Sequence, residues 1–285
     1  MPLPSSLSIL HVSDVHFGAS VVPEQVEAIE ALAHARRYDA IAISGDLSLR
    51  ARAGELQRAR VFVRDLRKVS PVIVVPGNHD VAWWRSPLHL WGAGTMYVPY
   101  LHNMGEELEP ILHLPGTTLV GLNTAQGVHA RTLTWNMRDI SIIGDLRPSQ
   151  LERARAAFAE APATDLRVVV LHHNLTRGHL SQRYGVKRAR ATVEALHGMG
   201  VELVLTGHDH QEAVHAHVHN GKTMLVLTAG TISKRSRGGR PSSVHEIVAT
   251  ERQFEVVTRT WVDGGEGRPG KGGGFEALAS QCFAR

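Results

Sequence analysis

Five short apolar segments of this chain each end at side chains that can bind a metal ion or transfer a proton. The clearest case is residues 72–75, an apolar run that breaks at Pro76-Gly77 and continues directly as Asn78-His79-Asp80. Taken alone, these residues fit a capped turn, because Asn and Asp are ordinary turn and N-cap residues. Four other apolar segments end in similar residues, and a series of unrelated turns does not explain that recurrence. The pattern predicts strands that deliver polar groups to one place.

The first part of the sequence alternates predicted strands and helices. Residues 7–13, 38–44 and 72–75 are apolar runs of strand length, whereas residues 23–37 and 54–68 carry apolar residues at helical spacing. A β-α-β-α-β order favours parallel strands with helices packed on the sheet. Such sheets bind ligands beyond the carboxyl ends of their strands. The candidate residues at these ends are Asp14, His16, Asp46, Asn78 and His79.

The second half of the chain shows the same kind of strand end. Strands are predicted over residues 117–123, 166–171 and 201–205, and a helix over residues 148–161. The second of these strands is followed by His172-His173-Asn174, and the third by Gly207-His208-Asp209-His210. A buried structural histidine is the ordinary explanation for any one of these residues. Their shared position at strand ends favours ligands instead.

The remaining segments give weaker signals. Residues 224–229, 243–249 and 254–262 have β character, and we expect them to belong to a second sheet. Residues 81–116 are rich in aromatic residues and read as an insertion, either a lid over the substrate or a packing element; packing is favoured because most aromatic residues belong to cores. We expect a single domain over residues 1–263. The Gly-rich segment over residues 264–285 reads as a flexible tail.

Two further clusters have ordinary explanations. His215, His217 and His219 alternate along a predicted strand, and a solvent-facing histidine surface is favoured over a second metal patch because no carboxylate accompanies them. The basic run over residues 177–190 is typical of a solvated face. Because this run follows His172 closely, we keep substrate binding as the alternative. The residues concerned are Arg177, His179 and Arg183.

Composition excludes several classes of protein. The chain has 285 residues, of which 43% are hydrophobic, so it is not disordered throughout. The single Cys282 cannot form an internal disulfide, and no apolar run reaches the ~20 residues of a membrane span. The net charge of +4 is a weak indication of an anionic partner. The N-terminal residues lack the basic region of a signal peptide, so we expect a cytoplasmic protein.

Together the strand ends supply seven oxygen or nitrogen ligands: Asp14, His16, Asp46, Asn78, His172, His208 and His210. One metal ion rarely takes seven protein ligands of this kind, whereas two ions that share one carboxylate do. The chain resembles the calcineurin-like metallophosphoesterases over about residues 7–210. That resemblance rests on five blocks in order: Asp14-x-His16, Gly45-Asp46, Gly77-Asn78-His79-Asp80, His172 and Gly207-His208-x-His210. Their form is similar to that of the bacterial class III cyclic-nucleotide phosphodiesterases.

The resemblance implies a fold and a metal centre. The expected fold is α/β, a four-layer α-β-β-α sandwich of two mixed β-sheets flanked by helices, with a binuclear metal site at the carboxyl ends of the strands. It implies two divalent or mixed-valence ions, Mn, Fe or Zn. The ligands of one ion would be Asp14, His16, Asp46 and His210. Asp46 would bridge to the second ion, whose other ligands would be Asn78, His172 and His208.

The resemblance also implies catalytic roles. A hydroxide that bridges the two ions would attack the phosphorus. His79, next to the ligand Asn78, would donate a proton to the leaving alkoxide or steady a phosphoryl oxygen. Asp80 would either orient His79 or cap the following turn, and the sequence does not separate these two roles.

We expect a metal-dependent phosphodiesterase that acts on a cyclic nucleotide or a related small diester. Asn174 departs from the branch, which has Pro there, and the loop after it borders the site in the family. Substrate choice is therefore open to a DNA or RNA nuclease, a phosphomonoesterase or a phospholipid-headgroup hydrolase, all acting on an anionic phosphoester. A non-catalytic scaffold is disfavoured because the ligand positions and His79 are intact. The sequence is compatible with a homodimer.

Overall fold

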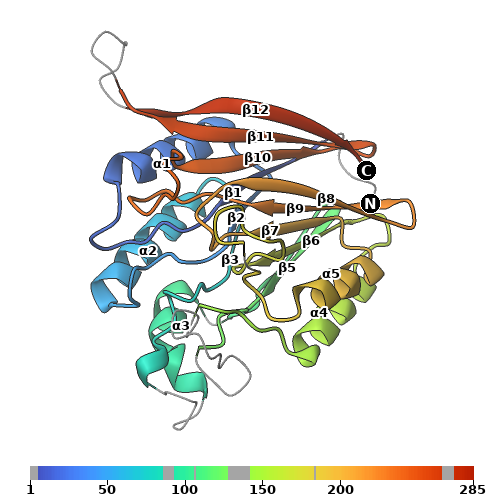
Figure 1. Cartoon of the computed structure of the whole chain (residues 1–285), viewed down its shortest axis with the longest axis horizontal. Helices are drawn as coiled ribbons and strands as arrows, with labels where there is room; N and C mark the ends of the chain where they lie inside the picture. The colour runs from blue at the N-terminus through green and yellow to red at the C-terminus, as the bar shows by residue number, and fades with distance from the viewer. Residues whose placement is uncertain (1–5, 86–92, 106, 128–141, 183, 265–272) are drawn as a thin grey trace.

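The computed structural model describes residues 6–85, 93–105, 107–127, 142–182, 184–264 and 273–285. Its two six-stranded sheets are stacked, with helices on the outer sides (Figure 1). The first sheet contains, in chain order, β1 (Leu7–Val12), β2 (Ala40–Ile43), β3 (Val72–Val74), β10 (Ser243–Ala249), β11 (Gln253–Val262) and β12 (Gly274–Ala284). The second contains β4 (Ile111–Leu114), β5 (Thr117–Leu122), β6 (Leu166–Leu171), β7 (Leu203–Thr206), β8 (Ala213–His219) and β9 (Lys222–Thr228).

Both sheets are mixed, as predicted. The strand order is β12-β11-β10-β1-β2-β3 in the first sheet and β4-β5-β6-β7-β9-β8 in the second. Strands β1, β2 and β3 run parallel, and so do β5, β6, β7 and β9. The other neighbours pair antiparallel. The parallel strands bring the loops that follow them to one edge of the sandwich.

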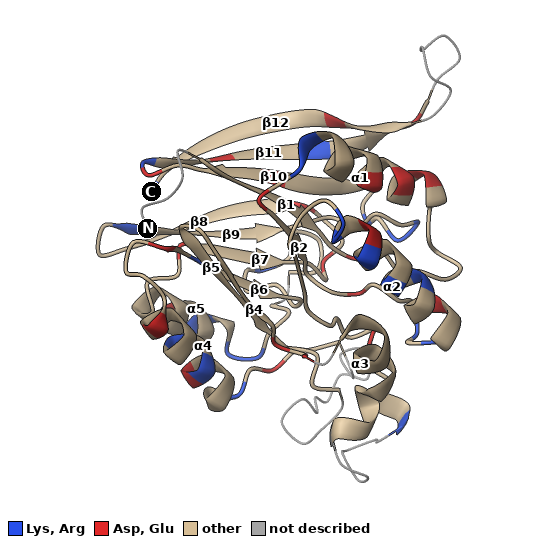
Figure 2. Ribbon diagram, turned by 180° about the vertical axis from the view of Figure 1, so that it is seen from behind, with Lys and Arg blue, Asp and Glu red and all other residues tan. Residues whose placement is uncertain are grey.

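Four layers arise because the central strands alternate their side chains between two cores. In β2, Ile41 and Ile43 pack under the helices, whereas Ala40 and Ala42 face the other sheet. The helices α1 (Pro23–Arg36) and α2 (Ala53–Leu66) cover the first sheet. The helices α4 (Pro148–Glu160) and α5 (Ala189–Gly198) cover the second, on the opposite side of the molecule (Figure 2). The predicted fold class is therefore confirmed.

The expectation that residues 243–249 and 254–262 belong to the second sheet is wrong. They form β10 and β11 in the first sheet, where β10 pairs antiparallel with β1. Only the segment near residues 224–229, which forms β9, lies in the second sheet. Inward-facing apolar residues of both sheets meet in one shared core, so the apolar pattern of a strand does not specify the sheet to which it belongs.

Residues 274–284 are not a flexible tail. They form the edge strand β12, which pairs antiparallel with β11 along its length. Two aromatic residues anchor its ends. The ring centroids of Phe275 and Trp261 are 5.3 Å apart, and Phe283 packs against the core between the sheets. The side chains between these two are mostly exposed, so the sequence lacks the apolar pattern from which a strand would be predicted. Residues 265–272, the centre of the predicted tail, lie outside the described residues.

The aromatic segment after the site forms several short elements: η1 (Trp83–Arg85), η3 (Ala93–Met96), α3 (Val98–Met104) and the unpredicted strand β4. Tyr97 and Tyr100 are buried in hydrophobic clusters, so these two aromatic residues serve packing. Trp84, in contrast, is 50% exposed. Trp91 lies outside the described residues.

Candidate metal centre

The candidate ligands lie on the loops that follow the parallel strands, and many have an unusual backbone. Positive φ angles occur at Asp14 (55°), His16 (50°), Asp46 (52°), His208 (73°) and His210 (58°). Non-glycine residues rarely adopt this conformation. Each instance costs roughly 1–3 kcal/mol and persists only where the surrounding structure enforces it. Such strain is typical of functional sites, and the residue types alone do not reveal it.

Two glycines allow the loops after β2 and β3 to approach closely. A Cβ atom on Gly77 would lie 2.1 Å from Oδ1 of Asp46. Gly45 has a φ of +91°, and a Cβ on it would lie 2.7 Å from the backbone nitrogen of Gly77. The carboxylate of Asp46 fits into this space, where its Oδ1 accepts a hydrogen bond of 2.8 Å from the backbone N–H of His79.

Four of the predicted ligands form a first group. One ligand atom from each of Asp14, His16, Asp46 and His210 lies within 4.8 Å of the others, and all four residues are buried. Nε2 of His210 is 3.1 Å from Oδ1 of Asp14 and 3.1 Å from Nε2 of His16. Nε2 of His16 is also 3.8 Å from Oδ2 of Asp46. These two oxygens and two nitrogens converge on one point.

The other predicted ligands form a second group on the far side of Asp46. Nε2 of His172 is 3.4 Å from Oδ2 of Asp46 and 3.2 Å from Oδ1 of Asn78. Nδ1 of His208 is 3.1 Å from the same Asn78 oxygen. The structure therefore brings together all seven predicted ligands, with Asp46 shared between the two groups. His173, which was not predicted as a ligand, also lies within ligand distance of His172 and His208.

The donor set fits metal cations. Nδ1 of His210 contacts the carbonyl oxygen of Arg235 at 2.9 Å, and Nδ1 of His172 contacts that of Ser44 at 2.7 Å. A carbonyl oxygen only accepts, so each Nδ1 carries a proton and each Nε2 points into the cluster. Carboxylate oxygens and imidazole nitrogens arranged in this way suit Mn, Fe or Zn.

The cluster also attracts positive charge. Burial raises the pKa of Asp46, but the neighbouring imidazoles, His172 first, bring that pKa well below its usual range. Burial lowers the pKa of His172, but Asp46 overcomes this effect and raises it to about 9. In contrast, burial and the charge of His172 lower the pKa of His208 to about 3. The ionised carboxylate of Asp46 thus stabilises a positive charge beside it. A bound metal ion would be stabilised there in the same way as the proton on His172.

His79 lies at the edge of the two groups. Its Nδ1 donates to the carbonyl oxygen of Leu49 at 2.6 Å, which leaves Nε2 as the nitrogen available for other contacts. The ring is half-buried and stands edge-on to that of His16, with 4.9 Å between the ring centroids. The backbone thus fixes the orientation of the imidazole beside the metal groups.

Asp80 binds backbone groups from two loops. Its carboxylate accepts hydrogen bonds from the backbone N–H groups of Leu47 (3.1 Å), Ser48 (2.7 Å) and Gly77 (3.0 Å), and from the Ser48 hydroxyl (2.8 Å). Burial, followed by the charge of Asp46, raises the pKa of Asp80 to about 6. These contacts match neither predicted role, because they reach neither the His79 side chain nor the turn that follows Asp80. They join the loop of Asp46 to the loop of Asn78.

Two adjoining cavities lie beside the second group. The larger has a volume of about 770 Å³ and reaches His208. The smaller, of about 300 Å³, is lined in part by His179. Arg177 lines both cavities. Among the predicted substrate residues, Arg183 lies outside the described residues.

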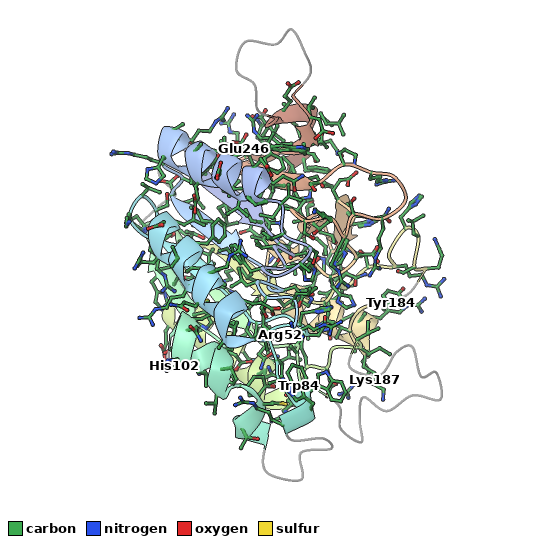
Figure 3. All side chains as sticks on the ribbon, turned by 90° about the vertical axis from the view of Figure 1, so that its left-hand side faces the viewer. Arg52, Trp84, His102, Tyr184, Lys187 and Glu246 are labelled. Atoms are coloured by element: carbon green, nitrogen blue, oxygen red, sulfur yellow. The ribbon has the colours of Figure 1, made fainter. Side chains whose placement is uncertain are left out.

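Tyr184 also lines the larger cavity, and nothing in the sequence pattern around it marks that residue. Arg237, in the same wall, belongs to the basic segment over residues 233–240, which the sequence offers as a basic rim in support of the nuclease alternative. Figure 3 faces the edge that carries the strand ends and shows Tyr184 and Lys187 on the segment after β6, with Arg52 and Trp84 on other segments. Strand β8 carries His215, His217 and His219. In the described part of the chain, these three histidines are not among the groups of three or more close residues that could hold a metal ion.

The pattern that describes the calcineurin-like phosphoesterases matches residues 7–212 of the sequence. The chain belongs to this family. It is therefore a phosphoester hydrolase of the metallophosphoesterase type, and its two His/Asp groups fit a binuclear divalent metal site. A search of curated proteins found no match. Within the described residues, no helix has the length and apolar character needed to cross a membrane.

Solved structures share the fold at low sequence identity. PhoD is 12% identical with a TM-score of 0.65, and the match covers 100% of this chain and 70% of PhoD. The purple acid phosphatase PPD1 from yellow lupin is 12% identical with a TM-score of 0.66, covering 100% of this chain and 55% of PPD1. GAP50, described as the anchor in the inner membrane complex of Plasmodium, is 12% identical with a TM-score of 0.58, and the match covers 99% of this chain and 89% of GAP50. At this identity the likeness concerns the fold.

Proposed function

We propose that this family member is a metal-dependent phosphodiesterase acting on small phosphodiesters such as cyclic nucleotides. The observation that carries the proposal is the convergence of seven ligand side chains into two groups that share Asp46, with His79 beside them. A decayed, non-catalytic scaffold would not need so many strained and buried polar residues in one place.

In this proposal Asp14, His16, Asp46 and His210 hold one ion, and Asp46 also contributes to the second. The second ion is held by Asn78, His172 and His208. Two divalent ions, Mn, Fe or Zn, would lower the pKa of a water molecule, orient the phosphate and neutralise its charge.

The chain's own groups then orient the ligands and the substrate. The carbonyl oxygens of Ser44 and Arg235 hold the imidazoles of His172 and His210 in the orientation that points Nε2 inward. The carbonyl oxygen of Leu49 holds Nδ1 of His79, so Nε2 of His79 is the atom that would deliver a proton to the leaving oxygen. Asp80 acts on the chemistry indirectly, because it fixes the loops that carry Asp46 and Asn78.

The cavity beside His208 favours a diester over a monoester. A monoester has one alcohol portion, whereas a diester extends from the phosphorus in two directions. A volume of about 770 Å³ next to a candidate ligand accommodates the second portion. A nuclease would use the same cavity for one nucleotide and would need further cationic contacts along the strand.

A substrate panel tests the proposal. Purified protein, depleted with a chelator and then loaded separately with Mn²⁺, Fe²⁺ or Zn²⁺, is assayed with cyclic AMP, 2′,3′-cyclic AMP, single-stranded DNA, bis-p-nitrophenyl phosphate and p-nitrophenyl phosphate. We expect the two cyclic nucleotides and the small diester to have the highest kcat/KM. Preference for p-nitrophenyl phosphate would show a monoesterase, and activity confined to DNA that falls steeply with added salt would show a nuclease.

A further inference from the structure

We infer that the larger cavity beside His208 is a subsite for a planar aromatic ring on the alcohol portion of the substrate. This inference rests on the proposed function, because the ring-bearing alcohol would be esterified to a phosphate held at the metal centre. It adds a substrate class and a specificity-determining residue, Tyr184, for which the sequence pattern gave no signal.

The walls of the cavity combine apolar and cationic groups. Tyr184, Ile142 and Ile143 supply apolar surface, and Ile142 is 43% exposed. The guanidinium of Arg177 lies 5.6 Å from the centroid of the Tyr184 ring. A contact of this kind attracts the cation to the ring face and limits the positions of both side chains. Such apolar surface next to a cluster of carboxylates and imidazoles matches a ligand with an anionic end and a flat apolar end.

Backbone contacts build this cavity firmly. The N–H of Gly144 donates to the carbonyl oxygen of Gly185 at 2.8 Å, and the N–H of Lys187 donates to that of Gly144 at 2.9 Å. These bonds hold Ile143 beside Tyr184. The N–H of Gly185 also donates to the carbonyl oxygen of Asn174 at 3.0 Å, which ties the segment to the end of β6.

Close packing sets the distance from the cavity wall to the metal centre. A Cβ atom on Gly185 would lie 2.3 Å from Oδ1 of Asn174, and a Cβ on Gly178 would lie 2.2 Å from Oδ2 of Asp209. Asp209 directly follows His208, the candidate ligand that lines the cavity. The backbone that carries Tyr184 therefore packs closely at Gly178 and Gly185, where there is no room for a side chain, and this packing fixes the position of the Tyr184 ring.

The charges of the cavity suit an anionic ligand without demanding a second phosphate. Arg237 lies 3.7 Å from the carboxylate of Asp209, so these two charges offset one another. Among the described residues that line the cavity, Arg177 then supplies the remaining cation, and its contact with Tyr184 places it beside the aromatic subsite. Stacking on an aromatic side chain is tolerant of the ring's identity because every such ring has a π-face. A nucleobase and a simple aryl group are therefore two sources of the same chemistry.

The test compares three diesters that share one leaving group: methyl p-nitrophenyl phosphate, phenyl p-nitrophenyl phosphate and the p-nitrophenyl ester of thymidine 5′-phosphate. We expect the ring-bearing diesters to have about tenfold higher kcat/KM than the methyl diester. Tyr184→Ala should lower that ratio about tenfold, whereas Tyr184→Phe, which keeps the ring, should retain it. A gain for thymidine alone assigns the ring to a nucleoside, and equal gains for thymidine and phenyl assign it to aryl groups in general.

A binding measurement separates recognition from catalysis. Calorimetric titration of metal-loaded protein with thymidine 5′-phosphate should give a dissociation constant about tenfold higher for Tyr184→Ala than for Tyr184→Phe, with no such difference for methyl phosphate. Equal kcat/KM for all three diesters in the wild type, or equal losses for all three in Tyr184→Ala, would overturn the aromatic subsite and leave the proposed function standing. Hydrolysis of none of the three by the metal-loaded protein would overturn the proposed function itself.

Discussion

Asp80 provides a sharp test of how the site is held together. Its carboxylate is the only acceptor described here for the backbone N–H groups of Leu47, Ser48 and Gly77, and it also accepts from the Ser48 hydroxyl. Asp80→Ala leaves three buried N–H groups without their acceptor, and each such group costs about 1–3 kcal/mol. The free energy of unfolding should therefore fall by about 3 kcal/mol or more.

Asp80→Asn should cost much less. The amide keeps one oxygen acceptor, and the Ser48 hydroxyl can turn to accept from the new NH₂ group. One backbone N–H remains unsatisfied, at about 1–3 kcal/mol. Removing the charge offsets part of this cost, because burial and Asp46 already raise the pKa of Asp80 to about 6. We therefore expect a loss near the lower end of that range, about 1 kcal/mol.

Urea unfolding of the metal-free proteins measures these losses, with Asp165→Asn as the control. Asp165 is also buried, but its side chain accepts one hydrogen bond in the described structure, from Thr118 at 3.0 Å. Folded Asp80→Asn should bind metal more weakly than the wild type and recover turnover at saturating metal. If Asp80→Asn kept full stability and full metal content but lost turnover, the positioning role would be refuted, and Asp80 would have a direct part in the reaction.

Three further predictions concern the site and the core. His79→Ala should slow diesters of alkyl alcohols more than p-nitrophenyl diesters, because only poor leaving groups need the proton; equal losses in kcat would argue against proton donation. Gly77→Ala should lower the metal content measured by mass spectrometry, since the new Cβ would lie 2.1 Å from Oδ1 of Asp46, and wild-type content would contradict the close-packing argument. Burial lowers the pKa of His245, so the folded state resists protonation while the unfolded chain takes up a proton below about pH 6.5; stability should fall as pH drops through that value. Urea unfolding at pH 7.5 and 5.5 should show a loss about 1 kcal/mol larger in the wild type than in His245→Gln, and parallel curves would refute it.

The strand ends could be predicted because two short-range rules act together there. Apolar runs such as residues 72–75 mark buried strands, and parallel connections bring their carboxyl ends to one edge. All seven predicted ligands consequently converge, from Asp14 to His210.

Other features depend on contacts that a linear pattern does not contain. Strand β12 is held by pairing to β11 and by Phe275 and Phe283, although the side chains between them are exposed. The placement of β10 beside β1 depends on which sheet has a free edge. The position of Tyr184 depends on backbone bonds to Asn174 and Gly144, which lie far from one another in sequence.

Metal stoichiometry tests the central claim most directly. Chelator-treated protein is titrated with Mn²⁺ by calorimetry, and turnover of bis-p-nitrophenyl phosphate is followed at each point. We expect two ions per wild-type chain, release of protons on binding as His172 gives up its proton, and turnover that appears with the second ion. Asp46→Asn, which weakens the shared ligand, should bind fewer ions and lose turnover. Full turnover by the chelated protein, or saturation at one ion per chain with full activity, would contradict the account.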